Sequence, residues 1–252
     1  MTVVFVHGAP ETADIWDGVR DHLAVDSVAL RLPGFGSPRP RSFGATVDEY
    51  VQWLVERLRS IPGPIDLVGH DIGAVLTYRV VADPTVTVRS WVADSAGVLH
   101  PDHRWHELAK VWQTVGAGEE FVRQAVAVPK TLGTTLHTLG LPETHRAHGQ
   151  FDAEMGSAVL DLYRSMLESR YRAWGPSTRT RAPGLVVHPV RDGLDEYGSA
   201  IEIARQLGAT LYLMPGAGHW WMLDDPAAAA QALSDFWQSL FPATGAQWPF
   251  NS

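Results

Sequence analysis

The sequence of 252 residues predicts an α/β protein in which helices flank a mainly parallel sheet. Two observations predict this class: short apolar runs ending in Gly, Pro or Asp recur along the chain, and helical patterns separate them. An apolar fraction of 45% is sufficient for a substantial core. One long stretch without strand signals indicates that a helical segment interrupts the alternation.

Six apolar runs are the predicted strands. Each is short and is followed by a turn-forming residue, as is typical of strands buried on both faces. The runs are TVVFVHG from Thr2, SVALRLPG from Ser27, IDLVGHD from Ile65, VRSWVADS from Val88, GLVVHPVRD from Gly184 and ATLYLMPGAGH from Ala209. The connections between them are long enough for the crossover helices that parallel strands require.

Helices are indicated where apolar residues recur at spacings of three and four. The clearest pattern runs from Val47 to Leu58, and another begins near Pro226, which suits a first helical turn. A third pattern, around Val159, falls inside the interruption. We therefore predict a helical segment there as well as helices between the strands.

The interruption predicts how the chain is organised into domains. Residues 1–97 and 183–252 carry all six strand signals and form the predicted core. Residues 98–182 form a predicted helical cap, which we expect over the carboxyl ends of the strands, where ligands bind in open parallel sheets.

Composition narrows the function classes. A net charge of −8 without any run of Lys or Arg argues against nucleic acid and anionic membranes as partners, so a small molecule is expected. The absence of cysteine excludes disulfides, thiolate metal sites and a cysteine nucleophile. The chain enters a strand pattern without a leader or a long apolar span, so we expect a cytoplasmic protein outside the membrane. The sequence leaves open whether the protein forms a homodimer.

The segment IDLVGHDIGAVLTYRVV predicts a sharp turn between a buried strand and an apolar helix. Its centre reads Gly-x-Asp-x-Gly, the context of a nucleophile elbow, with Asp71 at the apex. Gly69 and Gly73 fit because so tight a turn leaves no room for side chains. The alternative is that Asp71 only caps the following helix, a position that Asp often takes.

Two further signals favour the elbow. His219 follows the last predicted strand, and Asp192 follows the strand before it, which gives the chain order nucleophile, acid, histidine. Asp94, at the end of an earlier strand, is an alternative acid. His7 lies directly after the first strand, where a backbone N–H of the following loop forms part of an oxyanion hole in such hydrolases.

On these motifs the sequence resembles the α/β-hydrolase-fold enzymes with an aspartate nucleophile, the epoxide hydrolases and the haloalkane and haloacid dehalogenases. HGAP, LPGFGSP and GHDIG carry the resemblance, which extends over nearly the whole chain. It implies the α/β-hydrolase fold, with the cap inserted after the family's sixth strand. It also implies a reaction that needs neither a cofactor nor a metal.

Carried over residue by residue, the resemblance implies a role for each member of the site. Asp71 is the expected nucleophile, His219 the base and Asp192 the acid that orients it. The amides of Ala9 and Ile72 are the expected oxyanion hole.

A carboxylate nucleophile favours displacement at saturated carbon. Attack on an ester would give an anhydride that collapses back, whereas attack on a saturated carbon gives a stable alkyl-enzyme ester. Water activated by His219 then hydrolyses that ester to release the product. The expected substrate is a small hydrophobic epoxide or halogenated compound, and water is the second reactant.

Epoxide hydrolysis is the preferred reaction, and dehalogenation is the alternative. An epoxide oxygen needs a proton donor, and the resemblance implies that Tyr163 in the late cap supplies it. Dehalogenases of this group carry Trp or Arg directly after the nucleophile, where this chain has Ile72.

The second tyrosine of the epoxide hydrolases has no counterpart in the early cap, residues 97–130. Several aromatic and imidazole side chains are candidates for that place or for other substrate contacts. They are Trp105, Trp112, His103 and His106 in the early cap, Tyr171 as a reserve for Tyr163, and His7 and Trp220 in the core.

Other classes fit less well. The loops after the first two strands do not read G-x-G-x-x-G, which argues against a dinucleotide-binding dehydrogenase, and no H-E-x-x-H motif indicates a metal hydrolase. A noncatalytic relative that binds a small hydrophobic ligand is the remaining competitor, because fold alone does not establish activity.

Overall fold

The computed structural model describes residues 1–142, 145–167 and 179–240. Its centre is a six-stranded parallel sheet in the order β2-β1-β3-β4-β5-β6. The strands are β1 (Thr2–Val6), β2 (Ser27–Leu30), β3 (Ile65–Gly69), β4 (Ser90–Ala93), β5 (Gly184–Pro189) and β6 (Thr210–Met214). Each lies within a predicted run, so the predicted parallel α/β class is confirmed.

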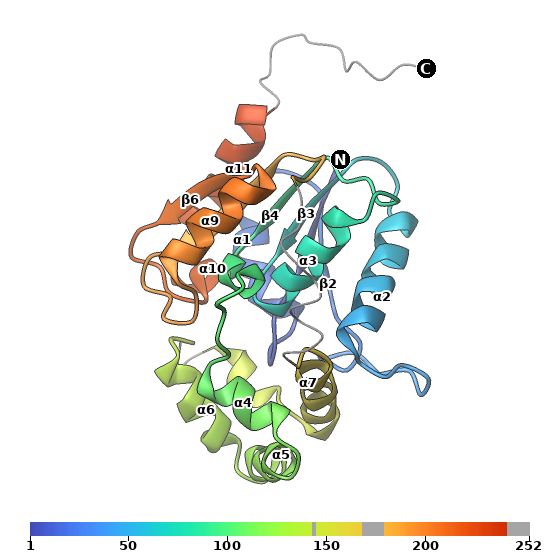
Figure 1. Cartoon of the computed structure of the whole chain (residues 1–252), viewed down its shortest axis with the longest axis vertical. Helices are drawn as coiled ribbons and strands as arrows, with labels where there is room; N and C mark the ends of the chain where they lie inside the picture. The colour runs from blue at the N-terminus through green and yellow to red at the C-terminus, as the bar shows by residue number, and fades with distance from the viewer. Residues whose placement is uncertain (143–144, 168–178, 241–252) are drawn as a thin grey trace.

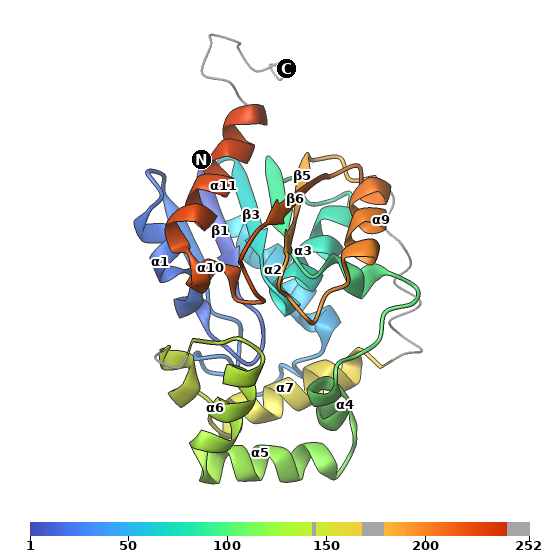
Figure 2. The ribbon, with the colours of Figure 1, turned by 90° about the vertical axis from the view of Figure 1, so that its left-hand side faces the viewer.

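Helices cover both faces of this sheet (Figures 1 and 2). One face carries α2 (Val47–Ser60), α3 (Ile72–Ala82) and α9 (Tyr197–Leu207), and the other carries α1 (Asp17–Asp21), α10 (Trp221–Asp224) and α11 (Pro226–Leu240). Two 3-10 turns, η1 (Ala13–Trp16) and η2 (Ala96–Leu99), follow β1 and β4. Within the described ranges, no helix combines the length and the hydropathy of a membrane span.

The helices between β4 and β5 form a separate layer beyond one end of the sheet (Figures 1 and 2). They are α4 (Glu107–Gln113), α5 (Ala117–Ala127), α6 (Pro129–Thr138), η3 (Arg146–Gly149) and α7 (Ala153–Ser165). The division of the chain into a core and a cap at 98–182 stays a prediction. We call these helices the helical insertion.

Polar contacts join the helical insertion to the sheet layer. Gln150 Nε2 donates to Asp14 Oδ2 at 2.9 Å, beside η1. Arg39, in the loop after β2, binds Asp161 Oδ2 on α7 at 2.7 Å and donates its backbone N–H to Glu154 at 2.6 Å. These bonds fix α7, the helix that carries Tyr163, against the core.

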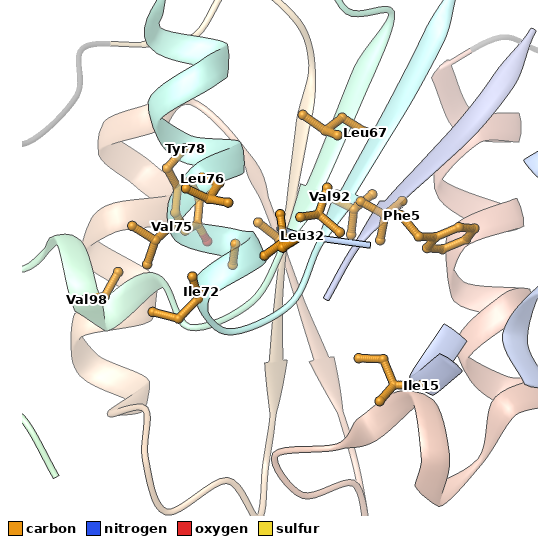
Figure 3. Packing of buried hydrophobic residues seen from close by; sticks show 14 of the residues in the cluster. Phe5, Ile15, Leu32, Leu67, Ile72, Val75, Leu76, Tyr78, Val92 and Val98 are labelled. Atoms are coloured by element: carbon orange, nitrogen blue, oxygen red, sulfur yellow. The ribbon is translucent and has the colours of Figure 1, made fainter. Parts of the chain in front are cut away.

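The apolar core fills both sides of the central strands (Figure 3). Trp91 of β4 packs against Tyr78 of α3, whereas Phe5 of β1 packs on the other side against Trp16. Burial of each apolar side chain of this size stabilises the fold by about 1.5 to 3 kcal/mol. The labelled members include Phe5, Leu67, Ile72, Val75, Leu76 and Val92. This packing holds the start of α3 at the carboxyl end of β3.

Two glycines let α3 begin in contact with the sheet. A Cβ built on Gly73 would lie 2.3 Å from the Val6 carbonyl oxygen, and one on Gly69 would lie 2.3 Å from the Gly73 carbonyl oxygen. Both obstacles are backbone atoms, which do not move aside as a flexible side chain does. The glycines predicted at the turn are therefore required by close backbone approach.

Gly73→Ala is expected to destabilise the protein by about 1 to 3 kcal/mol, because the added methyl displaces α3 from the sheet. Gly198→Ala is the matched control: that glycine lies in α9 with nothing within 4 Å of an added Cβ, so the change should be neutral or stabilise by up to about 1 kcal/mol. Urea unfolding followed by circular dichroism measures both. Equal stabilities for the two variants would contradict the steric argument.

Candidate active site

Asp71 occupies the turn between β3 and α3 in a strained backbone conformation. Its φ is 50° and its ψ is −117°, a region that costs a non-glycine residue about 1 to 3 kcal/mol. Its side chain makes no capping hydrogen bond to α3. Helix capping, the alternative explanation of this residue, therefore does not describe its carboxylate.

A backbone donor and a side-chain acceptor hold Asp71 from two sides. The Ala9 amide donates to Asp71 Oδ1 at 3.0 Å, and the Asp71 amide donates to Asp94 Oδ1 at 2.9 Å. The other predicted oxyanion donor, the amide of Ile72, belongs to the first residue of α3, where an N–H has no acceptor within the helix. Of the two predicted donors, the Ala9 amide contacts Asp71 Oδ1, and the oxyanion hole stays a prediction.

His219 lies between two carboxylates. Its Nδ1 is 2.9 Å from Asp192 Oδ2, and its Nε2 is 3.9 Å from Asp71 Oδ2. Asp192 Oδ1 accepts the Leu194 amide at 2.8 Å, which fixes the carboxylate that orients the ring. The three residues that the sequence selected are brought together at the carboxyl ends of β3, β5 and β6.

The charges around His219 set its protonation. Burial alone lowers the pKa of His219, but the Asp192 carboxylate, and then Asp71 and Asp94, outweigh burial and raise it to about 10. Burial raises the pKa of Asp192, but the charge and hydrogen bond of His219 outweigh that effect and lower it. The ring therefore favours its charged form.

Asp94 has partners other than His219. Its Oδ2 lies 2.6 Å from His70 Nδ1 and accepts the Trp221 indole N–H at 2.6 Å. Its Oδ1 binds the Asp71 amide. Of the two acids left open by the sequence, Asp192 is therefore the one in contact with His219.

A small cavity lies above Asp71, with a volume of about 40 Å³. A larger groove of about 1020 Å³ adjoins it, and His103, His106, Leu194 and Asp195 line both. The side chains around the cavity come from the core and from the helical insertion. They are Asp71, Ile72, Val75, Ser95, Val98, His103, Trp105, His106, Tyr163, Leu194, Asp195 and His219.

Four of the predicted cap residues line this cavity: His103, Trp105, His106 and Tyr163. Tyr163 is buried, and its ring packs edge-on against Trp105 at 5.7 Å and Trp112 at 4.8 Å between centroids. Trp105 lines the cavity beside it, whereas Trp112 packs within the helical insertion. Tyr171 lies outside the described residues.

The predicted core contacts have other partners. His7 is fully buried; its Nδ1 lies 2.7 Å from the Gly8 carbonyl oxygen, and its Nε2 accepts the Leu32 amide at 3.1 Å. Burial lowers the pKa of His7 to about 4, so the ring is neutral. The Trp220 indole donates to Glu11 Oε2 at 2.5 Å. The polar atoms of both rings bind residues of the loops around the site and do not point to the cavity.

Sequence reasoning did not select Glu11 or His70. Both are buried next to the site, with exposed fractions of 3% and 0%. A signal existed, because Glu11 directly follows HGAP and His70 directly precedes Asp71, and both therefore stand at carboxyl ends of strands. In the described ranges, no group of three or more His, Asp or Glu side chains is arranged to hold a metal ion.

Comparison with known proteins assigns the family. A sequence profile described as "Alpha/beta hydrolase family" matches residues 3–232. The chain belongs to this family. A curated hydrolase of Acinetobacter baylyi, (E)-2-((N-methylformamido)methylene)succinate hydrolase, is 27% identical over 109 residues, which cover 42% of this chain and 41% of that protein.

Solved structures of other enzymes share the fold of this alpha/beta hydrolase. The epoxide hydrolase VrEH1 from Vigna radiata is 18% identical with a TM-score of 0.74, covering 94% of this chain and 91% of that one. A loop variant of the haloalkane dehalogenase DbeA from Bradyrhizobium elkanii is 16% identical with a TM-score of 0.73, covering 97% and 91%. The predicted fold and the predicted resemblance to these two groups are confirmed.

Protonation of His219 is expected to make stability fall at high pH. Its pKa is about 10 in the folded protein against 6.5 for an unperturbed histidine, so the folded state binds this proton more tightly. The stabilisation is complete below about pH 6.5 and is lost as the pH rises through about 10. Urea unfolding across this window should show a smaller loss of stability in His219→Gln than in the wild type. Parallel pH profiles for the two proteins would contradict this assignment.

Proposed function

We propose that this hydrolase opens an epoxide to a diol through a covalent ester on Asp71. One observation carries the proposal: the Asp71 carboxylate does not cap its helix, is held by the Ala9 amide and faces His219. A serine in this position would attack acyl carbons. A carboxylate instead displaces a leaving group from saturated carbon.

The contacts of Asp71 assign a task to each of its oxygens. Oδ1 is bound by Ala9 N, so it becomes the carbonyl oxygen of the ester. Oδ2, the oxygen nearer to His219, is free to attack the epoxide carbon. The C–O bond of the epoxide breaks as the new C–O bond forms, and its electron pair leaves on the epoxide oxygen, which takes a proton from the enzyme.

Hydrolysis of the ester uses the other side of the site. A water between His219 and the ester carbon gives its proton to Nε2 as its oxygen attacks Cγ of Asp71. The negative charge forms on Oδ1 and is stabilised by the Ala9 and Ile72 amides. Collapse breaks the ester C–O bond, and the diol oxygen leaves with the proton from His219. The second water proton, left on the Asp71 carboxyl group, returns to the group that protonated the epoxide oxygen, which restores the carboxylate and the donor.

Neutralisation of Asp71 prepares His219 to act as the base. The Asp71 carboxylate is one of the charges that raise the pKa of His219. Once Asp71 is esterified, that charge is gone and the pKa of His219 falls, which favours the unprotonated ring that accepts the water proton.

Two side chains of the helical insertion are suited to protonate the epoxide oxygen. Burial, and then the charge of Asp71, raise the pKa of Tyr163 well above its usual value, so the hydroxyl keeps its proton. His106 Nδ1 accepts the Ala109 amide at 3.2 Å, so in the neutral ring the proton lies on Nε2. Burial lowers the pKa of His106, which keeps the ring neutral. We infer that His106 takes the place of the missing early-cap tyrosine.

Dehalogenation of a halogenated compound is the second candidate. The same O–H and N–H donors, with Trp105 beside them, are suited to solvate a departing halide. Ile72 supplies no side-chain donor next to the nucleophile, which favours the epoxide.

The covalent mechanism is tested by trapping the ester. His219→Gln should form the alkyl-enzyme and fail to hydrolyse it, so a mass increase equal to the epoxide accumulates on the peptide that contains Asp71. Asp71→Asn is the matched control and should show no adduct. In heavy-oxygen water, the wild type should incorporate label into Asp71 after repeated turnovers. Label that enters the diol alone would exclude the ester.

The proton donors are tested by removing them singly. Tyr163→Phe and His106→Phe should each slow alkylation by an epoxide by about 100-fold or more, as loss of a general acid typically does, and slow alkylation by a haloalkane less. Tyr50→Phe is the control, since the Tyr50 hydroxyl donates to the Pro33 carbonyl oxygen away from the cavity. Rapid-quench mass spectrometry gives each rate. Equal losses with both substrates would favour a halide-binding role.

A further inference from the structure

Glu11 is a buried carboxylate that joins two loops of the candidate site. Its Oε1 accepts the Gly8 amide at 2.8 Å, and its Oε2 accepts the Trp220 indole N–H at 2.5 Å. Gly8 precedes Ala9, the oxyanion donor, and Trp220 follows His219, the predicted base. The Trp220 ring also packs edge-on against His219 at 4.9 Å between centroids.

His70 links Glu11 to the nucleophile turn. Its ring is fully buried, with Nδ1 2.6 Å from Asp94 Oδ2 and Nε2 3.5 Å from Glu11 Oε1. Burial alone lowers the pKa of His70, but the charges of Asp94 and Glu11 outweigh burial and raise it. Burial raises the pKa of Glu11, and the charge of His70 opposes that effect. A protonated His70 ring between Asp94 and Glu11 offsets the cost of burying their charges.

The Glu11–His70–Asp94 array therefore forms hydrogen bonds to the backbone of Asp71 and to residues adjacent in sequence or nearly so to Ala9 and His219. Asp94 binds the Asp71 amide and the Trp221 indole, and Glu11 binds the Gly8 amide and the Trp220 indole. The bonded groups come from the loops after β1, β3 and β6, which carry Ala9, Asp71 and His219.

We propose that Glu11 is a positioning residue that holds the Ala9 amide and His219 in place for hydrolysis of the ester on Asp71. This inference rests on the proposed function.

The second step depends on this alignment more than the first. During alkylation, negative charge leaves the Asp71 carboxylate, and His219 transfers no proton. During hydrolysis, charge concentrates on Oδ1 against the Ala9 amide while His219 accepts a proton from water. Misplacement of either group therefore slows hydrolysis more than alkylation.

Glu11→Gln is the sharpest change available. A glutamine has one acceptor oxygen and one donor NH₂, so it can accept from Gly8 or from Trp220, and not from both. Its size and burial are otherwise preserved. We expect the rate of ester hydrolysis to fall at least about tenfold, since an unpaired buried donor is costly, and the alkylation rate to change less than about threefold. The alkyl-enzyme should then accumulate during turnover.

Asp66→Asn is the matched control. Asp66 is also fully buried and accepts hydrogen bonds from Ser90 Oγ at 2.6 Å and Arg89 Nε at 2.8 Å. It lies near the amino end of β3, away from the cavity, so its amide variant tests what loss of a buried carboxylate does in general. Accumulation of ester in both variants, or equal slowing of both steps in Glu11→Gln, would overturn the proposal.

A double-mutant cycle tests the bond to Trp220 itself. Trp220→Phe removes the indole donor and keeps an aromatic ring beside His219. If Glu11 acts through that donor, Glu11→Gln should slow hydrolysis less in the Trp220→Phe background than in the wild type. Independent, additive losses would show that Glu11 does not act through Trp220 and would overturn that link.

A spectroscopic measurement separates this inference from the proposed function. Nuclear magnetic resonance of the free protein should show the Trp220 indole proton and the Gly8 and Ala9 amides shifted in Glu11→Gln and unshifted in Asp66→Asn. Unshifted signals in Glu11→Gln overturn the positioning role whatever reaction the enzyme performs. If the wild type forms no ester with any epoxide while these signals shift, the proposed function fails, and what stands is that Glu11 holds the Gly8–Ala9 loop and Trp220 in place.

Discussion

The backbone strain at Asp71 is the constraint on which the site depends. A φ of 50° aims the carboxylate out of the turn, away from the helix that it would otherwise cap. The conformation persists because β3 and α3 are packed on either side of it, with Gly73 against the Val6 carbonyl. The hydrogen bond from the Asp71 amide to Asp94 Oδ1 also holds the turn. The packing of β3 and α3 therefore fixes the orientation of the Asp71 side chain.

The parallel sheet explains why distant residues meet at this turn. All strands deliver their carboxyl ends to one edge, so the residues that follow β1, β3, β5 and β6 are neighbours in space. Their charges are mutually adjusted: carboxylates alternate with imidazoles from Asp192 through His219 to Asp71, and from Glu11 through His70 to Asp94. Asp71 and His219 of the first series line the cavity. All three members of the second series are buried.

Strands, the central turn and the three residues around His219 could be predicted because each has a local signal. Apolar runs, glycines at fixed offsets and polar residues at strand ends are visible in one dimension. Asp192 was the expected partner of His219 and Asp94 the alternative; both follow a strand, and the contact in the fold is with Asp192. The role of Glu11 could not be predicted, because its partner Trp220 lies 209 residues away in the sequence.

The side chains of the helical insertion were the least predictable. Its helices carry aromatic and imidazole residues on several faces, and which of them line a cavity depends on tertiary packing. His106 shows this well, because its position follows from its bond to the Ala109 amide at the start of α4. Trp112, in contrast, is buried within the insertion and packs against Tyr163.

The size of the cavity above Asp71 bears on regiochemistry. About 40 Å³ accommodates roughly three water molecules, whereas the adjoining groove is far larger, at about 1020 Å³. His103, His106, Leu194 and Asp195 line both spaces, so a molecule that is too long for the cavity extends past these residues into the groove. In the proposed reaction, the narrow end of such a molecule reaches Asp71 first. Substitution of the four residues that line both spaces should then change which of the two ring carbons is attacked.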